Sequence, residues 1–338
     1  MSDVIVHARA PLRISFAGGG TDVPPYPQRR GGAVLSATID WSAYASVRAV
    51  EAPGIAVSSP DMSTAAAVSG RQELAQVVID DVGALPGEGG AEVTMSCDAP
   101  PGSGLGSSSS LIVSMAAALA ELRGRPIPPY ELAARAVRLE REDLGVPGGL
   151  QDQYAAVFGG FNFIEFNGDD VLVHPLRLRN EVLAELHGSL VLVPAPVQSR
   201  RSSGILTRQI AQTTDDESDT MDRLDRIKQA AVDMRTCLLQ GDLGGVGDLL
   251  HDGWMAKREL TAGITTSGID EVYAAARSLG ALGGKLLGAG GGGYLLLMVP
   301  FDARGGFVRA MRERDLAPLS FSFTDHGVQA WRPTPPVA

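Results

Sequence analysis

The chain has 338 residues, 44% of them hydrophobic, and its formal net charge at pH 7 is −10. The length exceeds that of most single domains and the apolar content is enough for two cores, so we expect two domains. The acidic balance disfavours a nucleic acid or an anionic membrane surface as a partner. A phosphate site would therefore have to draw its positive charge from local groups.

Cysteine and histidine usage excludes several kinds of site. Cys97 and Cys237 are the only cysteines, too few for a disulfide framework and without the C-x-x-C spacing of zinc or redox sites. The five histidines lack ligand spacing, so we predict no zinc site. No signal-like segment or apolar run of about 18 residues is present. We expect a soluble, cytoplasmic protein that is a monomer or a homodimer.

Strands and helices are predicted along the whole chain. In the first half, composition predicts strands at 5–16, 33–50, 92–97 and 160–166, and helices at 111–123 and 130–143. In the second half we predict strands at 189–193, 292–299 and 319–323, and helices at 221–238, 245–260, 269–279 and 307–314. The polar run 213–220 is typical of an exposed loop and 333–338 of a frayed tail.

Three glycine-bearing segments lie far apart, at 10–22, 100–110 and 285–299. In the middle one, PPGSGLGSSSS, the glycines let the backbone turn its N–H groups outward, and a helix N-terminus that attracts anions follows at once. The serine hydroxyls can cap that helix or bind Mg²⁺. We predict a phosphate-binding loop made of Pro101, Gly102, Ser103, Gly104, Leu105, Gly106, Ser107, Ser108 and Ser109.

This loop has two alternative interpretations. It could be a plain Gly/Ser turn with Ser107 as an ordinary N-cap. A Walker loop is excluded, because Ser107 stands where the Gly-Lys-Ser/Thr element of that pattern would begin.

The last segment contains the spacing G-x-G-x-x-G at Gly288, Gly290 and Gly293. In a dinucleotide site the glycines follow a strand and open a helix, whereas here a strand-like run follows them. The segment is then either a tight structural turn or a backbone surface against a ligand, since consecutive glycines weaken a strand unless something approaches closely. We favour the second interpretation and expect Gly290 and Gly291 to contact the nucleotide.

Together these residues resemble the GHMP kinases. The second motif of that family is met at 100–108, its C-terminal glycine motif at 288–293, and its sugar-type opening motif by Arg13, Gly18, Gly19, Gly20, Thr21 and Asp22. The strings GGLQDQYAAVFGGFNF, WMAKREL and GALGGKLLGAGGGG and the stretch 199–203 are similar to the D-glycero-D-manno-heptose 7-phosphate kinases. The resemblance extends from about residue 9 to residue 323.

The resemblance implies a two-domain fold of the α/β (α+β) class. An N-terminal ribosomal-protein-like α/β domain would comprise 1–180 and a C-terminal ferredoxin-like domain 181–338, with the break near 176–185. The ligands would bind in the cleft between the two domains.

Asp152 is the candidate base, because a loop carboxylate can accept a proton from the substrate hydroxyl or orient that hydroxyl toward the γ-phosphate. Alternatively it caps the helix that follows; the resemblance favours the catalytic role. Arg13 could orient Asp152 or pair with a phosphate, or form an inter-strand ion pair.

Glu140 lies twelve residues before Asp152, the separation between the metal-ligating glutamate and the aspartate of galactokinases. The resemblance therefore implies that Glu140 and Ser108 bind Mg²⁺. Glu142 is the rival ligand, and either glutamate could instead be a solvated helix carboxylate.

For the acceptor we expect contacts from Gly19, Gly20, Thr21 and Asp22, since an aspartate can accept two sugar hydroxyls. Galactokinases have Glu-His where this chain has Gly19-Gly20, which disfavours galactose. The candidate partners of a distal substrate phosphate, each of which could also be a plain surface charge, are Arg200, Arg201, Lys257 and Lys285.

The resemblance implies a kinase that uses ATP and Mg²⁺. We expect it to phosphorylate the anomeric hydroxyl of D-glycero-D-manno-heptose 7-phosphate, giving the 1,7-bisphosphate, through positioning and charge stabilisation. A cyclitol phosphate or another sugar is an alternative acceptor. A non-catalytic sugar sensor should lack a carboxylate at 152 or 140, and both are present. An ATP-dependent decarboxylase is disfavoured by the sugar-type opening motif.

Overall fold

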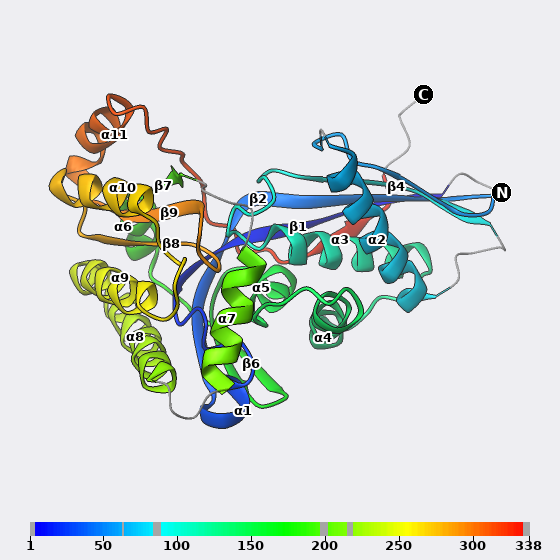
Figure 1. Cartoon of the computed structure of the whole chain (residues 1–338). Helices are drawn as coiled ribbons and strands as arrows, with labels where there is room; N and C mark the ends of the chain where they lie inside the picture. Colours follow the sequence, from blue (N-terminus) through cyan, green and yellow to red (C-terminus); the bar gives the residue numbers. More distant parts are fainter. Residues whose placement is uncertain (1–3, 63, 84–88, 197–201, 215–218, 334–338) are drawn as a thin grey trace.

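The computed structural model describes residues 4–62, 64–83, 89–196, 202–214 and 219–333. Figure 1 shows an elongated molecule in which long strands with helices against one face form one lobe, and a smaller sheet with its helices forms the other. The fold is the mixed α/β architecture that we expected.

The first lobe is built on a seven-stranded sheet in the order β10-β1-β2-β4-β3, with β5 paired to β2 and β6 to β5. Its strands are β1 (Ile5–Ala17), β2 (Gly32–Val50), β3 (Ile55–Ser58), β4 (Gly90–Cys97), β5 (Phe161–Asn167), β6 (Asp170–Pro175) and β10 (Gln329–Trp331). All pairs are antiparallel except β3 with β4. The long β2 pairs with β5 through its first half and with β4 through its second.

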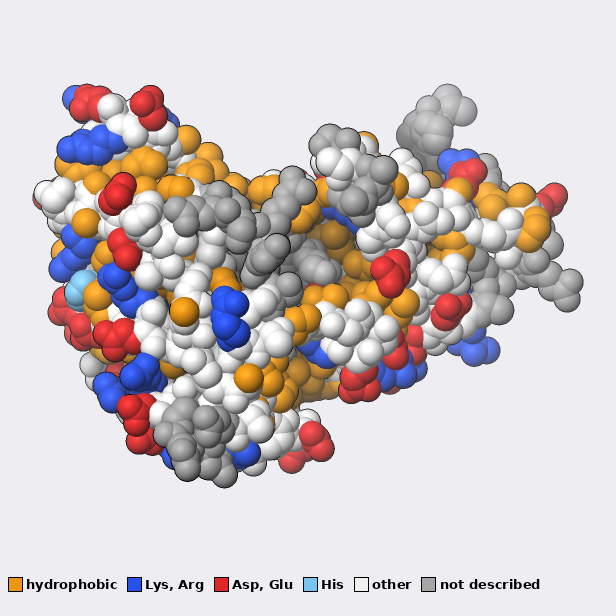
Figure 2. Space-filling model, in the orientation of Figure 1, with side chains coloured by type: hydrophobic (Ala, Val, Ile, Leu, Met, Phe, Trp, Pro, Cys, Tyr) orange, Lys and Arg blue, Asp and Glu red, His pale blue; other side chains and the backbone are white. Residues whose placement is uncertain are grey.

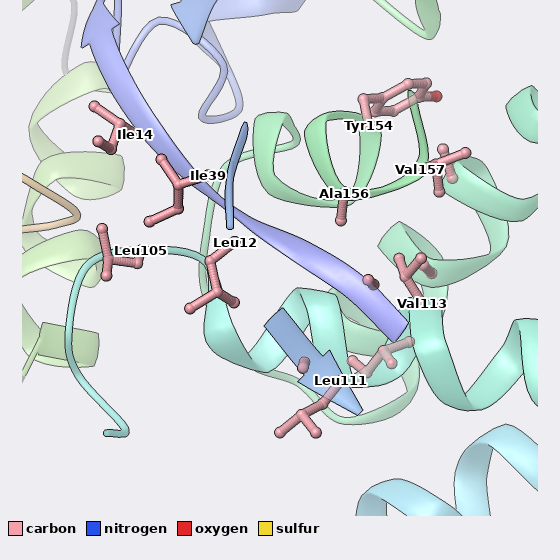
Figure 3. Close-up of a cluster of buried hydrophobic side chains, with 14 of the residues drawn as sticks. Leu12, Ile14, Ile39, Leu105, Leu111, Val113, Tyr154, Ala156 and Val157 are labelled. Atoms are coloured by element: carbon pink, nitrogen blue, oxygen red, sulfur yellow. The ribbon is translucent and has the colours of Figure 1, made fainter. Parts of the chain in front are cut away.

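Helices cover this sheet and supply its core. They are α1 (Tyr26–Arg30), α2 (Ala65–Val82), α3 (Ser107–Leu122), α4 (Pro129–Arg138), a π-helix (Leu139–Asp143) and α5 (Gln151–Phe158). The apolar face of α3 packs against β1 and β2, and α5 packs beside it. Figure 3 shows side chains of this core from several elements, among them Leu12 and Ile14 of β1, Val113 of α3 and Ala156 of α5. Because α3 is buried along its length, its N-terminus is fixed at the end of the core.

The second lobe has a three-stranded antiparallel sheet in the order β7-β9-β8. Its strands are β7 (Leu190–Ala195), β8 (Gly283–Leu286) and β9 (Gly293–Met298). Its helices are α6 (Asn180–Ser189), α7 (Ser202–Thr214), α8 (Thr220–Gln240), α9 (Leu243–Arg258), α10 (Ser267–Ser278), a 3₁₀ turn (Phe301–Ala303) and α11 (Arg304–Arg312). Their apolar faces enclose a second core around the fully buried Trp254.

The predicted strand at 319–323 is wrong. Leu319 forms an isolated bridge to Leu192 of β7, and Phe323 forms one to Ile39 of β2. Since this short segment crosses from one sheet to the other, it pairs with each sheet only once. The bridge at Leu319 occupies the place of a fourth strand beside β7, which gives the ferredoxin-like order with one strand reduced to a single pair.

The prediction also missed the helices α2, α6 and α7, and further differences lie at element ends and in short elements. The helix predicted at 130–143 begins as α4 and widens into a π-helix at Leu139. The loop predicted at 213–220 is shorter, since α7 continues through Thr214 and α8 begins at Thr220. Residues 215–218 and 334–338 lie outside the described residues. The domain break near 176–185 stays a prediction, and β10 returns to the first sheet. None of the helices described is both long and apolar enough to cross a membrane.

Candidate functional site

All three glycine segments contribute to one cleft between the lobes. Its wall includes Gly19 and Gly20 of the first segment, Gly102, Gly104 and Gly106 of the second, and Gly288, Gly290 and Gly292 of the third. Figure 2 shows the surface hollowed between the lobe that carries α10 and α11 and the part that carries α2. Segments that are far apart in the sequence thus form a single site.

The middle and last glycine segments touch each other through their backbones. Gly104 has φ +78°, and a Cβ there would lie 2.4 Å from the carbonyl oxygen of Leu287. A Cβ at Gly288 would lie 2.6 Å from the Cα of Gly104, and one at Gly293 would lie 2.5 Å from the carbonyl oxygen of Ser103. Several of these glycines are therefore required by contact between two loops, which is the structural interpretation of the last segment. Gly290 lines the cleft, whereas Gly291 is not among its lining residues.

The middle segment ends at the N-terminus of α3. Gly106, with φ +80°, is the N-cap residue and no side chain caps the helix. Ser107 is therefore the first helical residue and not an N-cap. The amides of the first turn are left for a ligand, and a helix N-terminus with free amides fits a phosphate. Of the predicted loop, the residues that line the cleft are Gly102, Gly104, Gly106, Ser107, Ser108 and Ser109, whereas Pro101, Ser103 and Leu105 do not.

Asp152 lies in the first turn of α5 and is held by Arg13 of β1. The Arg13 guanidinium donates from Nε to Asp152 Oδ1 at 2.8 Å, and its second nitrogen Nη2 lies 2.6 Å from the same oxygen. Its third nitrogen donates to the carbonyl oxygen of Gly104 at 2.6 Å. The other oxygen, Oδ2, lies 3.4 Å from where a Cβ on Gly106 would stand. Asp152 does not cap α5. Its carboxylate is held beside the phosphate loop by Arg13.

Glu140 reaches the cleft from the π-helix and is almost completely buried. Its Oε2 accepts hydrogen bonds from Ser109 Oγ and Gln153 Nε2, both at 2.6 Å, and lies 3.6 Å from the Arg141 guanidinium. A π-helical turn changes which side chain faces inward, and such turns are frequent at functional sites. The rival Glu142 is exposed and is not among the lining residues. Of the two glutamates, Glu140 lies at the cleft and Glu142 does not.

Asp22 is completely buried and ties the opening motif to the loop before α5. Its Oδ1 accepts from the Gly20 amide at 3.0 Å, and its Oδ2 accepts from the amide and the side chain of Gln151, each at 3.1 Å. A Cβ at Gly149 would lie 1.9 Å from Oδ2, so a glycine is needed there. Asp22 borders the cleft with Gly19 and Gly20, but Thr21 does not. The Thr21 hydroxyl instead lies 2.8 Å from the carbonyl oxygen of Gly18.

Sequence reasoning missed four polar side chains of the cleft, those of Ser15, Arg141, Gln151 and Gln209. Arg141 donates from Nε and Nη2 to the carbonyl oxygen of Gly149, at 3.0 and 2.9 Å, and so fixes the loop that precedes Asp152. Gln209 of α7 donates to the carbonyl oxygen of Gly20 at 3.4 Å. The sequence offered a signal for Arg141, which is next to Glu140, but none for Gln209, because α7 was not predicted.

Two lysines bring positive charge to the cleft from the second lobe, and both are mostly buried. Lys257 of α9 donates to the carbonyl oxygen of Gly288 at 2.5 Å. Burial and then the charge of Arg13 lower the pKa of Lys257 to about 8. Burial, followed by the charges of Lys257 and Arg13, lowers the pKa of Lys285 well below its ordinary value. The predicted partners Arg200 and Arg201 lie outside the described residues.

Comparison with known proteins gives consistent matches. The model of the GHMP kinases N terminal domain matches residues 66–160, and that of the GHMP kinases C terminal domain matches residues 234–315. The D-glycero-alpha-D-manno-heptose 7-phosphate kinase of Campylobacter jejuni is 34% identical over 97% of this chain and 99% of its own. The L-fucokinase/L-fucose-1-P guanylyltransferase of Bacteroides fragilis is 27% identical over 88% of this chain and 35% of its own.

Among solved structures, a D-glycero-D-manno-heptose 1-phosphate kinase from Bacteroides thetaiotaomicron is similar over 97% of this chain and 99% of its own. The TM-score is 0.78 and the sequence identity 32%. Two family models, a relative matched over nearly its full length and the shared fold agree with the geometry of the cleft. The chain therefore belongs to the GHMP kinase family.

Proposed function

We propose that this protein transfers the γ-phosphate of ATP to the anomeric hydroxyl of D-glycero-D-manno-heptose 7-phosphate, giving the 1,7-bisphosphate. The observation that carries the proposal is the position of Asp152. Its carboxylate is held by Arg13 beside Gly106, where the uncapped N-terminus of α3 opens into the cleft. A hydroxyl acceptor bound at this carboxylate would thus face a phosphate bound at the helix end.

The protein groups divide the chemistry between them. The Arg13 guanidinium occupies Oδ1 of Asp152, which leaves Oδ2 to accept a hydrogen bond from the acceptor hydroxyl. Asp152 then orients that hydroxyl and takes its proton as the phosphoryl group transfers. The first-turn amides of α3 hold the phosphate chain and stabilise the charge that develops on it. Because these groups are fixed by burial and hydrogen bonds, positioning accounts for much of the rate gain.

The residues present also fit Mg²⁺. Magnesium commonly takes one or two carboxylates and completes its octahedron with phosphate oxygens and water. Glu140 and Ser108 both line the cleft and would supply a carboxylate and a hydroxyl, while the described residues contain no cluster of three or more His, Cys, Asp and Glu side chains for a metal. When bound, the ion would be held by Glu140 and Ser108 and would neutralise charge on the phosphates.

The heptose assignment is supported by the names of the relatives. The Campylobacter jejuni protein is named a heptose 7-phosphate kinase and the Bacteroides thetaiotaomicron protein a heptose 1-phosphate kinase, so these names agree on a phosphorylated heptose and differ in where its phosphate lies. Similarity to the L-fucokinase keeps another sugar-like acceptor as the second candidate. The free thiols of Cys97 and Cys237 fit a reducing compartment, and we propose a cytoplasmic enzyme.

The proposal is tested with the purified protein, ATP, Mg²⁺ and a panel of acceptors: heptose 7-phosphate, heptose 1-phosphate, free heptose, L-fucose, galactose and a cyclitol phosphate. Phosphorus NMR identifies each product. We expect the highest kcat/KM with heptose 7-phosphate and a new phosphate signal on the anomeric oxygen. Preference for an unphosphorylated sugar, or phosphorylation at a different hydroxyl, would overturn the assignment.

A further inference from the structure

Lysine is rare in this chain and concentrated at one place. Only three of the 29 lysine and arginine residues are lysine, namely Lys228, Lys257 and Lys285. Lys228 lies in α8, and its amine donates to the carbonyl oxygen of Arg30. The other two line the same cleft and are 7% and 6% exposed. A chain that uses arginine almost everywhere else thus has lysine at two buried positions beside its candidate active site.

The two buried amines have fewer partners than their burial requires. Within the described part of the chain, the only hydrogen bond of the Lys257 amine goes to Gly288, and the Lys285 amine has neither a hydrogen bond nor an ion pair. A buried ammonium without a partner is costly, and two that repel each other are more so. Burial lowers the pKa of both amines, helped by the charge of Arg13 on Lys257 and by the charges of Lys257 and Arg13 on Lys285. An anion bound between them would supply the missing charge.

The position of the pair indicates which anion this is. The carboxylates whose charges act on Lys257 are Asp22 and Asp152, and the one acting on Lys285 is Asp22. The two lysines also line a small cavity behind the opening motif. Both lysines thus lie beside the opening motif, whose Gly18 and Gly19 line that cavity with them.

We infer that Lys257 and Lys285 form a subsite for an anionic group, a phosphate, that the acceptor already carries. The inference rests on the proposed function, since it places the acceptor hydroxyl at Asp152 and its phosphate beyond, against the two amines. An ammonium is a compact point charge with three donors, and two of them can share the oxygens of one dianion. The subsite selects phosphorylated over free sugars because an unphosphorylated acceptor supplies no opposite charge to either amine.

Kinetics of paired acceptors test the subsite. We would measure kcat/KM for heptose 7-phosphate, heptose 1-phosphate and free heptose with the wild type, Lys257→Met, Lys285→Met and the control Lys228→Met. Each cleft variant should lose tenfold or more of the preference for the phosphorylated acceptor, mainly through a higher KM. The control should keep it. If kcat falls equally with free and phosphorylated heptose, the amines serve the transferred group and the inference is wrong.

Chemical labelling tests binding without turnover. Pyridoxal 5′-phosphate is a phosphorylated aldehyde that condenses with an unprotonated amine, releasing water, and borohydride then fixes the adduct. With only three lysines, mass spectrometry of the full-length protein and its peptides assigns every modified side chain. We expect Lys257 or Lys285 to react before Lys228 and to be protected by sugar phosphates more than by the matching free sugars.

The two experiments separate the inference from the proposed function. If no heptose is phosphorylated but sugar phosphates still protect the cleft lysines, the subsite stands and the heptose assignment fails. If heptose 7-phosphate is turned over but neither gives protection nor loses its advantage in the Met variants, the subsite fails alone. Protection by ATP but not by sugar phosphates would likewise assign the amines to the nucleotide and overturn the inference.

Discussion

The two walls of the cleft differ in how well their charged groups are partnered. On the first lobe, Asp152 is paired with Arg13, Glu140 accepts from Ser109 and Gln153, and Asp22 accepts three hydrogen bonds. On the second lobe, Lys257 has one carbonyl partner. Lys285 has none among the described residues. The first wall is organised by its own hydrogen bonds, which suits groups that do chemistry, whereas in our proposal a ligand would complete the second, which suits selection among acceptors.

The largest expected effect on activity comes from removing the negative charge of Asp152 in the first wall. Asp152→Asn should lower kcat by about 10²-fold or more, the range for general acid–base groups, and should leave ATP binding and the fold intact. Steady-state kinetics and nucleotide titration measure the two quantities. Glu142→Gln is the matched control, because that carboxylate is exposed and outside the cleft. Turnover near that of the wild type in Asp152→Asn would remove this residue from the mechanism.

A smaller effect separates metal binding from acceptor binding on the same wall. Glu140→Gln should raise the Mg²⁺ concentration needed for half-maximal rate by roughly 10-fold or more, since it removes the charge of a proposed ligand. Asp22→Asn should instead raise the acceptor KM, because it weakens the hydrogen bonds that join the opening motif to Gln151. Magnesium titrations at saturating acceptor distinguish the two variants. The role assignment fails if both show the same acceptor defect and an unchanged Mg²⁺ requirement.

The backbone contact between the loops of the two walls, where Gly104 meets Leu287, can be disrupted by adding one methyl group. Gly104→Ala introduces a Cβ 2.4 Å from the Leu287 carbonyl oxygen, whereas Gly102→Ala, at nearly the same φ, meets nothing within 4 Å. Both changes carry the left-handed penalty of about 1–2 kcal/mol, and Gly104→Ala should cost about 1–3 kcal/mol more through overpacking. Urea unfolding curves give the difference. Equal losses in both variants would show that the two loops do not constrain each other.

The burial of Lys257 in the second wall predicts an unusual pH dependence of stability. Burial lowers the pKa of Lys257 from 10.5 to about 8, so the unfolded chain binds more protons than the folded one between these values. The free energy of unfolding should therefore gain a favourable contribution as pH rises from about 8 to about 10.5. Lys257→Met should remove this contribution and raise the Tm at pH 7 by about 2 °C or more. A lower Tm in Lys257→Met, with Lys228→Met unchanged, would contradict the prediction.

How much of this site could be predicted depends on whether a residue's role is set by its neighbours in the sequence or by contacts with distant residues. Glycine spacing and a helical run predicted the phosphate loop, because these signals are local, whereas Glu140 was favoured by the resemblance to galactokinases, which show the same separation from the aspartate. The burial of Thr21 against the backbone could not be predicted, since its partners include Ala33 on the next strand. The sequence alone could not distinguish Glu142 from Glu140. Both lie in the π-helix, and it is the folded turn that buries Glu140 and leaves Glu142 exposed.

Short elements escaped prediction for a similar reason. Strands such as β8 and β10 have only four and three residues, and their pairing is set by distant partners. The segment 319–323 has the composition of a strand, yet it connects two sheets and pairs once with each. Lys257 and Lys285 were recognised as candidates for a substrate phosphate, but only the folded chain brings them to one wall.

The pairing of β10 with β1 affects how the chain folds while it is synthesised on the ribosome. Ala330 lies opposite Ala8, so the first strand of the large sheet lacks one neighbour until residues 329–331 have been translated. The Phe323 bridge and the Thr324 amide, which donates to Thr38, are also late-arriving contacts on that sheet. Pairing over such a distance is slow, and until it forms the open edge of β1 is available to other strands. Nascent chains that stall before this point would be the species most in need of a chaperone.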